Sequence, residues 1–155
     1  MSILAKNKRA YYDYEIQDSI EAGLVLLGYE VKSIKAGLVS LKGSYVTIKR
    51  GKKTLPELYL INAHIPLYEK ASTITNYEPT NPRKLLLHKR QIERLIGKKQ
   101  EQGLTFVPLK IYSKKGFIKL EFGIGKGKKK YDKRESIKKR ENDRKMRTLT
   151  KMKYQ

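Results

Sequence analysis

The composition of this 155-residue chain changes abruptly at Gly125, and the change limits where a folded core can form. Residues 1–125 carry 22 basic and 11 acidic side chains, whereas residues 126–155 carry 14 basic and 4 acidic ones. The aliphatic side chains of the second segment are few: Ile137, Met146, Leu149 and Met152. So little apolar surface cannot offset the entropy of ordering the chain. We expect one domain over residues 1–125 and a basic tail over residues 126–155 that is disordered when free.

Residues 1–125 consist mainly of short apolar runs that alternate in polarity and are separated by turns. Such alternation is typical of strands with one face in a core. The runs predicted to form strands are Tyr11–Ile16, Gly23–Lys35, Gly43–Arg50, Glu57–Ile65, Leu104–Tyr112 and Gly116–Gly125. We expect a bend at Gly28 in the second run and a hairpin turn at Ser113–Gly116.

One segment, Leu86–Gly103, has helical spacing instead. Ile92, Leu95 and Ile96 lie at helical spacing, and the terminal Gly103 is a plausible C-cap, which favours a helix with His88 near its start. A second, short helical turn is expected at Asp18–Gly23. About six strands with one longer and one short helix predict a mainly β fold, a small six-stranded antiparallel OB-like barrel. Barrels of this kind often bind nucleic acid.

The formal net charge of +21 predicts a polyanionic partner. Nucleic acid binds such a charge favourably, because basic side chains release the counterions condensed on its phosphates. A membrane surface would require an amphipathic or lipidated anchor, and none is evident. No apolar run is long enough for a signal peptide, and none approaches the about eighteen residues of a membrane span. We expect a soluble cytoplasmic protein with no membrane partner and no small-molecule substrate.

The sequence has no pattern that requires an enzyme. It contains no cysteine, which excludes thiol catalysis and the usual zinc sites, and His64 and His88 lie in different predicted elements. The glycines of Gly123–Gly127 lack the Gly-Lys-Ser/Thr order of a phosphate-binding loop, so they indicate a strand end and a hinge to the tail. We predict no catalytic residue, no cofactor and no metal.

Three groups of residues are candidates for RNA contact. Glu30 lies in an apolar run, where its carboxylate either pairs with a lysine such as Lys32 or accepts hydrogen bonds from a base or ribose. Residues 6–9 place three cations before two tyrosines, which suits RNA because bases stack while phosphates are neutralised, although core packing explains the tyrosines equally well. In the tail, Asp132 and Glu135 favour a helix start, as in a segment that folds on a partner.

Four stretches resemble the small protein B (SmpB) family, the SsrA-binding proteins. They are NKRA (Asn7–Ala10), GYEVKSIKAG (Gly28–Gly37), YEPTNPRKLLLH (Tyr77–His88) and GKGKKKYDKRESIKKRE (Gly125–Glu141). In this order and spacing they are highly specific, and they span nearly the whole chain.

The resemblance implies a non-enzymatic adaptor that binds the tRNA-like domain of tmRNA and delivers it to stalled ribosomes for trans-translation. It implies that the tail enters the decoding centre and the empty mRNA channel of the small subunit and folds there as a helix. The residues implied to face tmRNA are Asn7, Lys8, Arg9, Glu30 and Lys32. Those implied to act at the decoding centre are Tyr131, Asp132, Lys133 and Arg134. The free protein is expected to be monomeric.

Two positions depart from the family pattern. Asn81-Pro82 precedes Arg83 where many relatives carry a further arginine, which puts an RNA contact from this loop in doubt. Tyr131 stands where relatives often have histidine, so stacking is preserved but an imidazolium charge is not. Two other functions stay open: a ribosomal or assembly protein with its tail permanently in rRNA, and an RNA-processing enzyme that uses Glu30 or His88.

Overall fold

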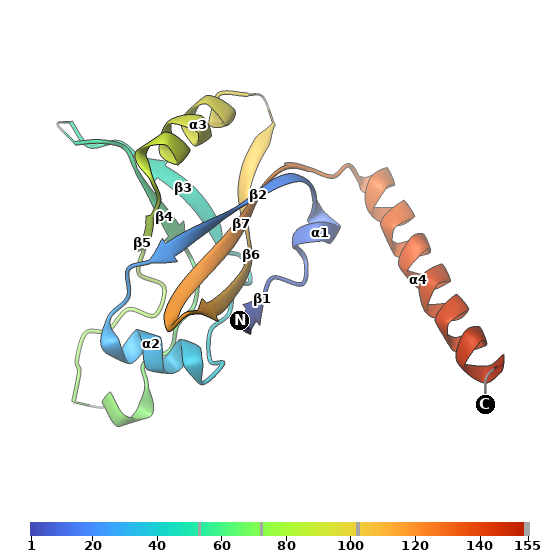
Figure 1. Cartoon of the computed structure of the whole chain (residues 1–155), viewed down its shortest axis with the longest axis horizontal. Helices are drawn as coiled ribbons and strands as arrows, with labels where there is room; N and C mark the ends of the chain where they lie inside the picture. The colour runs from blue at the N-terminus through green and yellow to red at the C-terminus, as the bar shows by residue number, and fades with distance from the viewer. Residues whose placement is uncertain (53, 72, 102, 154–155) are drawn as a thin grey trace.

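The computed structural model describes residues 1–52, 54–71, 73–101 and 103–153, and it shows a β-barrel from which one long helix projects (Figure 1). The strands are β1 (Ser2–Lys6), β2 (Tyr14–Leu24), β3 (Tyr45–Lys49), β4 (Glu57–Ile61), β5 (Arg83–Leu86), β6 (Leu104–Lys114) and β7 (Phe117–Gly127). The helices are α1 (Ala10–Asp13), α2 (Gly28–Lys35), α3 (Lys89–Lys99), α4 (Lys130–Lys153) and the short 3-10 helix η1 (Glu69–Ala71).

Six antiparallel strands close into a ring. Their order is β6-β3-β4-β5-β2-β7, and the ring closes because β6 pairs with β3 at one edge and with β7 at the other. Strand β1 pairs with β6 as a seventh strand. The long β6–β7 and β2–β7 ladders each contain a register shift, which lets a sheet curve. The predicted mainly β fold with a six-stranded antiparallel barrel is confirmed.

The core fills the ring with side chains from alternate strand positions. Phe106 of β6 and Phe122 of β7 are fully buried and meet edge to face, with ring centroids 5.9 Å apart. Helices α3 and α2 lie at opposite ends of the barrel (Figure 1) and contribute the fully buried Leu95 and Ile34 to the same core. The two helices thereby close the ends that the strands leave open.

The predicted strand Gly23–Lys35 is wrong in its second half, because β2 ends at Leu24 and the helix α2 follows. Leu27 is extended, and its N–H donates to the Glu30 carboxylate at 3.1 Å, which caps the helix. Helical spacing then turns one side of α2 into the protein. The buried residues of that side are Glu30, Ser33 and Ile34.

Three further expectations differ from the structure. The short helical turn at Asp18–Gly23 is wrong, because Ile20 and Ala22 alternate into the core as part of β2. The predicted strand Tyr11–Ile16 begins within α1. Strand β5, which completes the ring, was not predicted, since its four residues are too few to show a period.

The longer helix is confirmed as α3, and His88 is its N-cap residue. The His88 N–H donates to the side chain of Gln91 at 3.0 Å. The C-cap is Gln100 rather than Gly103, which has a φ of 81° in the turn before β6. Residue 102 of the predicted segment lies outside the described residues.

Gly123 and Gly125 lie inside β7 and are buried, so they do not form the predicted hinge. A Cβ at Gly123 would lie 2.8 Å from the side chain of Ile16, and one at Gly125 would lie 2.6 Å from the backbone oxygen of Glu15. The glycines therefore let β7 approach β2 closely. The strand ends at Gly127, where a Cβ would meet nothing within 4 Å.

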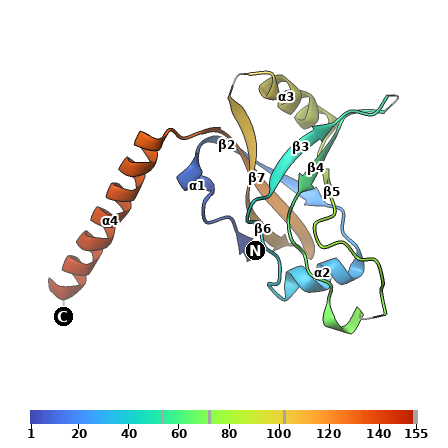
Figure 2. The same ribbon diagram turned by 180° about the vertical axis from the view of Figure 1, so that it is seen from behind.

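The tail differs from the predicted disordered segment, since Lys130–Lys153 form the continuous helix α4. Ser136, Thr148 and Thr150 each donate a side-chain hydrogen bond to the carbonyl four residues earlier. No described residue of α4 is buried, and the helix extends away from the barrel (Figure 2). Local interactions rather than a core therefore hold it. Residues 154–155 lie outside the described residues.

We predict that Gly125→Ala destabilises the barrel by about 1–3 kcal/mol, because the added methyl group must push β7 away from β2. The matched control is Gly127→Ala, where the space is open. Urea unfolding monitored by circular dichroism gives both free energies. Equal stability of the two variants would contradict the packing role of Gly125.

Candidate nucleic-acid interface

Glu30 and Arg83 form a buried ion pair, with side-chain exposures of 5% and 2% and a distance of 3.0 Å between Oε1 and Nη2. Arg83 uses every N–H of its guanidinium group. Nε and Nη2 donate to Glu30, Nη1 donates to the carbonyls of Ala63 and Pro79, and Nη2 also donates to the hydroxyl of Tyr77. A buried charge is tolerated when it is paired and fully hydrogen-bonded in this way.

The ion pair joins α2 to the start of β5, and the bonds of Arg83 to Ala63 and Pro79 tie in the long connection between β4 and β5. Tyr77 donates to the carbonyl of Ile65 at 2.6 Å, and its ring meets that of Tyr29 edge to face at 5.3 Å. Burial raises the pKa of Tyr77, so the hydroxyl keeps the proton that it donates. Ser33 of α2 donates to the carbonyl of Pro66 in the same connection. These contacts fix the surface at this end of the barrel.

The structure does not present Glu30 to a partner. The predicted pairing with a lysine such as Lys32 is wrong, because helical geometry turns Glu30 inward and Lys32 outward. Lys32 lies over the ring of Tyr68, with its Nζ 5.8 Å from the ring centroid. Glu30 therefore positions the elements that carry exposed cations, and its buried carboxylate is not available for direct RNA contact in this conformation.

The N-terminal candidates lie together between β1 and α1. Asn7 is anchored to β6, with its backbone N–H 2.8 Å from the Leu109 carbonyl and its side-chain amide 2.9 Å from the Pro108 carbonyl. Lys8 and Arg9 are exposed. Asn7 thus holds the loop that displays the two cations. Lys32 does not join this group, because α1 and α2 lie apart in both views (Figures 1 and 2).

The tail candidates occupy the first turns of α4. Tyr131 is 70% exposed, and Asp132 and Arg134 are exposed as well. A hydrogen bond to the side chain of Glu135 raises the pKa of Tyr131 above its ordinary value, which keeps the phenol neutral at physiological pH. Lys133 points the other way, toward α1.

Helix α1 connects the N-terminal group to the tail. Asp13 forms ion pairs with Arg9 at 3.4 Å and with Lys133 at 3.5 Å. Both cations also lie over the ring of Tyr12. The backbone N–H of Lys128 donates to the carbonyl of Asp13 at 2.8 Å. The two predicted groups are therefore neighbours at α1, although more than a hundred residues separate them in the sequence.

A groove of about 640 Å³ between β2, β7 and the start of α3 was not predicted. Leu86 is 55% exposed beside Gly23 in this groove, and Lys119 and Arg94 line it. Phe117 follows at the hairpin tip, 69% exposed, with the Nζ of Lys119 6.0 Å from its ring centroid. Alternation alone cannot tell an outward apolar side chain from a core one. The sequence signal that could have pointed to this groove is that Leu86 lies in one of the four stretches that resemble the SmpB family.

Glu21 gives this groove a fixed negative charge. Its carboxylate accepts hydrogen bonds from Tyr112 and Lys114. The bond from Tyr112 is the main cause that lowers the pKa of Glu21. Burial raises the pKa of Tyr112, which therefore remains a donor.

The described part of the chain contains no group of three or more His, Cys, Asp or Glu side chains that could hold a metal ion. Of the helices in the described segments, none is both long and apolar enough to cross a membrane.

Comparisons with known proteins agree on one family. The sequence model described as "SmpB protein" matches residues 4–152. A curated protein from Anoxybacillus flavithermus, named SsrA-binding protein, is 52% identical over 92% of this chain and 88% of its own length. The protein of the same name from Thermosipho melanesiensis is 49% identical over 97% of this chain and 99% of its own.

One solved chain is similar in both sequence and structure. It comes from work described as "tmRNA-SmpB: a journey to the center of the bacterial ribosome". It is 45% identical, has a TM-score of 0.65, and the match covers 86% of this chain and 93% of that chain.

We predict that Arg83→Gln lowers the free energy of unfolding by about 3–5 kcal/mol, because it leaves the buried Glu30 carboxylate without its partner. The neighbouring Lys84 forms a solvent-exposed ion pair with Glu57 at 2.9 Å, so Lys84→Gln should leave the free energy of unfolding close to that of the native chain. Chemical denaturation measures both. A cost for Arg83→Gln as small as that of the control would show that the pair does not anchor α2.

Proposed function

The chain belongs to the SmpB family, and from this premise we propose that it is an RNA-binding adaptor for trans-translation. In this role it binds the tRNA-like domain of tmRNA and delivers tmRNA to ribosomes stalled on incomplete messages. The SsrA-binding relatives and the similar tmRNA-SmpB chain support tmRNA and the ribosome as its partners. Its contribution is binding and positioning, without catalysis.

The observation that carries the proposal is the division of the molecule into a closed barrel and a projecting basic helix. Helix α4 has 11 basic and 4 acidic side chains, and none of its described residues is buried. A helix with this charge and no core gains stability by lying against a polyanion. Its 24 residues span about 36 Å, a length suited to an RNA-walled channel.

The barrel contributes the tmRNA contacts in this proposal. Lys8, Arg9 and Lys32 are exposed and meet phosphates directly. Asn7 and Glu30 act as positioning residues, Asn7 through β6 and Glu30 through Arg83. Both therefore affect RNA affinity without touching RNA.

The tail contributes the ribosomal contacts. Tyr131 stacks on an rRNA base as a neutral ring, with the exposed Asp132 and Arg134 beside it at the decoding centre. Lys133 acts there once it exchanges its ion pair with Asp13 for rRNA. The remainder of α4 occupies the empty mRNA channel. An intact message in that channel would exclude the helix, which makes the tail a sensor of stalling.

We expect truncation after Gly127 to leave tmRNA affinity within about threefold of the full chain and to abolish peptidyl transfer to tmRNA. Gly127 is the right end point because it still pairs with Tyr14 in the β2–β7 ladder. Filter binding gives the affinity, and tagging in a reconstituted translation system gives transfer. The triple variant Asp132→Ala, Lys133→Ala, Arg134→Ala should separate the two activities in the same way. Loss of tmRNA binding on truncation would refute this division of roles.

We expect Tyr131→His to introduce a pH dependence that the native chain lacks. The raised pKa of Tyr131 keeps the phenol neutral across pH 6–8, whereas the ordinary pKa of a histidine side chain is about 6.5. The imidazolium attracts rRNA phosphates, so transfer by the variant relative to the native chain rises as pH falls from 8 to 6. Tyr131→Phe is the control and follows the native profile. Parallel profiles for all three proteins would argue against an rRNA contact at this position.

A further inference from the structure

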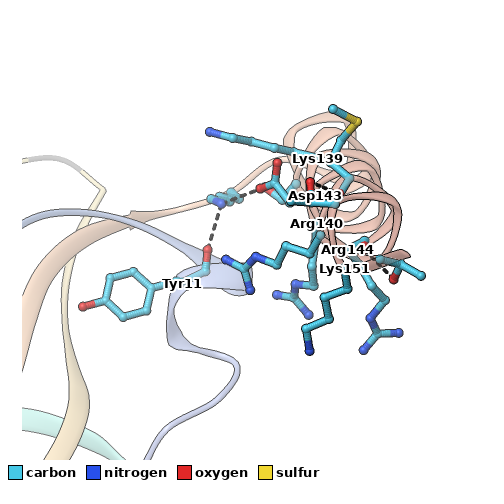
Figure 3. Close-up of a pocket in the computed structure, with 12 residues that line it drawn as sticks. Tyr11, Lys139, Arg140, Asp143, Arg144 and Lys151 are labelled. Carbon is cyan, nitrogen blue, oxygen red and sulfur yellow. Dashed lines mark hydrogen bonds between the residues drawn. The ribbon is translucent and has the colours of Figure 1, made fainter. Parts of the chain in front are cut away.

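Lys128 links the barrel to the tail helix from the short segment between β7 and α4. Its Nζ donates to the carbonyl of Tyr11 in α1 at 2.8 Å and to the hydroxyl of Ser136 in α4 at 2.9 Å (Figure 3). Its backbone N–H donates to the carbonyl of Asp13 at 2.8 Å. One residue is therefore bonded twice to α1 and once to α4.

The hydroxyl of Ser136 completes this bridge. It accepts from Lys128 and donates to the carbonyl of Asp132 at 3.0 Å, four residues earlier in α4. The hydroxyl thus uses its donor and one acceptor lone pair at the same time. Because Ser136 lies in the second turn of the helix, the amine of Lys128 is held against its side. The bridge therefore constrains the direction of α4 as well as the position of its start.

A lysine at position 128 does not favour the helix by its charge. The N-terminal end of a helix carries a partial positive charge, which favours acidic side chains and disfavours cations. Lys129, Lys130 and Lys133 already place positive charge at this end of α4. The two side-chain hydrogen bonds of Lys128 offset the repulsion, since bonds from a charged donor are stronger than neutral ones. The contribution of Lys128 is therefore to the joint between α1 and α4.

The other side-chain link at this joint is weaker. Lys133 pairs with Asp13 at 3.5 Å, and their side chains are 35% and 29% exposed. Exposed ion pairs contribute little stability and are screened by salt. Asp13 also pairs with Arg9 at 3.4 Å, so it keeps a partner when Lys133 turns to rRNA. The bonds of Lys128 involve neither of these side chains and persist through that exchange.

The direction of α4 matters because the helix is long. Its 24 residues extend about 36 Å from the joint. A change of about 20° at the joint would move the far end by about 12 Å, which is comparable to the diameter of a helix. None of the described residues of α4 is buried, so the core of the barrel does not fix this direction.

We propose that Lys128 is a positioning residue for peptidyl transfer to tmRNA, because its bridge between α1 and α4 directs the tail from the barrel toward the decoding centre. The inference rests on the proposed function. Lys128 contacts no reacting atom and acts through α4. A direction fixed in advance reduces the entropy that the tail loses on entering the mRNA channel. Loss of the bridge therefore raises the concentration of complex needed for transfer and leaves transfer at saturation nearly unchanged.

The first test measures peptidyl transfer against the concentration of the complex between tmRNA and the full chain. Lys128→Met removes the amine, and Lys129→Met is the matched control, because it removes the same charge from an exposed side chain outside the bridge. We expect the half-saturating concentration to rise about tenfold for Lys128→Met and less than about twofold for Lys129→Met. Both variants should bind tmRNA like the native chain. Equal effects of the two variants on transfer would overturn the proposal in favour of general charge attraction.

A second variant tests the bridge without a change of charge. Ser136→Ala removes the hydroxyl that accepts from Lys128, while alanine favours the helix. The double variant Lys128→Met, Ser136→Ala should transfer as well as Lys128→Met alone, because the two side chains act as one unit. Losses that multiply in the double variant would mean that the side chains act separately, and the bridge would then be wrong.

A third measurement follows the direction of α4 without RNA. The chain contains no cysteine, so Leu38→Cys and Met152→Cys, at side chains 48% and 70% exposed, accept a pair of spin labels. Double electron–electron resonance should give a narrow distance distribution for the labelled chain and for its Lys129→Met form. The Lys128→Met form should give a clearly broader one, with the helix content by circular dichroism unchanged. Distributions of equal width in all three proteins would contradict the positioning role.

Failure of the proposed function would be distinguishable from failure of this inference. In the first case, the native chain itself would not bind tmRNA or support transfer. In the second case, native transfer would be intact, and Lys128→Met would have the same half-saturating concentration as Lys129→Met.

Discussion

The ion pair between Glu30 and Arg83 is the interaction on which this end of the barrel depends. Arg83 is the first residue of β5, the shortest strand of the ring, and its guanidinium group also binds the carbonyls of Ala63 and Pro79. One side chain thus holds α2, the β4–β5 connection and the start of β5 together. Because both charges are buried, separating them would leave each without a partner at a large cost in free energy. The relative positions of α2, the connection and β5 are therefore fixed.

A second constraint acts where the chain leaves the barrel. Gly123 and Gly125 bring β7 against β2, and Lys128 follows immediately with three hydrogen bonds to α1 and α4. The tail therefore leaves a firmly packed strand through a bonded junction. This explains how a helix without a core has a definite direction, and how the N-terminal cations and the tail become neighbours.

The sequence allowed the class of fold to be predicted, because alternation in β3, β4, β6 and β7 is clear and Leu95 falls in an evident helical pattern. The prediction failed at Gly23–Lys35, where β-branched and aliphatic residues suggested a strand and the chain forms the helix α2 instead. There the Glu30 carboxylate caps the helix from within, a local bond that composition does not display. Strand β5 was missed because four residues are too few to show a period, and its place in the ring depends on pairing with the distant strands β4 and β2.

The candidate site was predictable in its charges and not in its contacts. The basic groups around Lys8 and Arg134 are evident from the residues and from the family resemblance. The burial of Glu30 depends on Arg83, which is 53 residues away in the sequence. The approach of α1 to α4 depends on closure of the whole barrel. Tertiary structure alone brings such distant residues together, so a single sequence does not reveal their pairing.

The central claim is that the barrel binds one RNA, tmRNA, and that helix α4 binds the ribosome. Sequencing of the RNA that copurifies with the tagged chain, with and without residues 128–155, tests it most directly. The account predicts that one tRNA-like RNA, tmRNA, dominates both preparations, while rRNA accompanies the full chain alone. A barrel preparation without tmRNA, or one dominated by rRNA, would contradict the account.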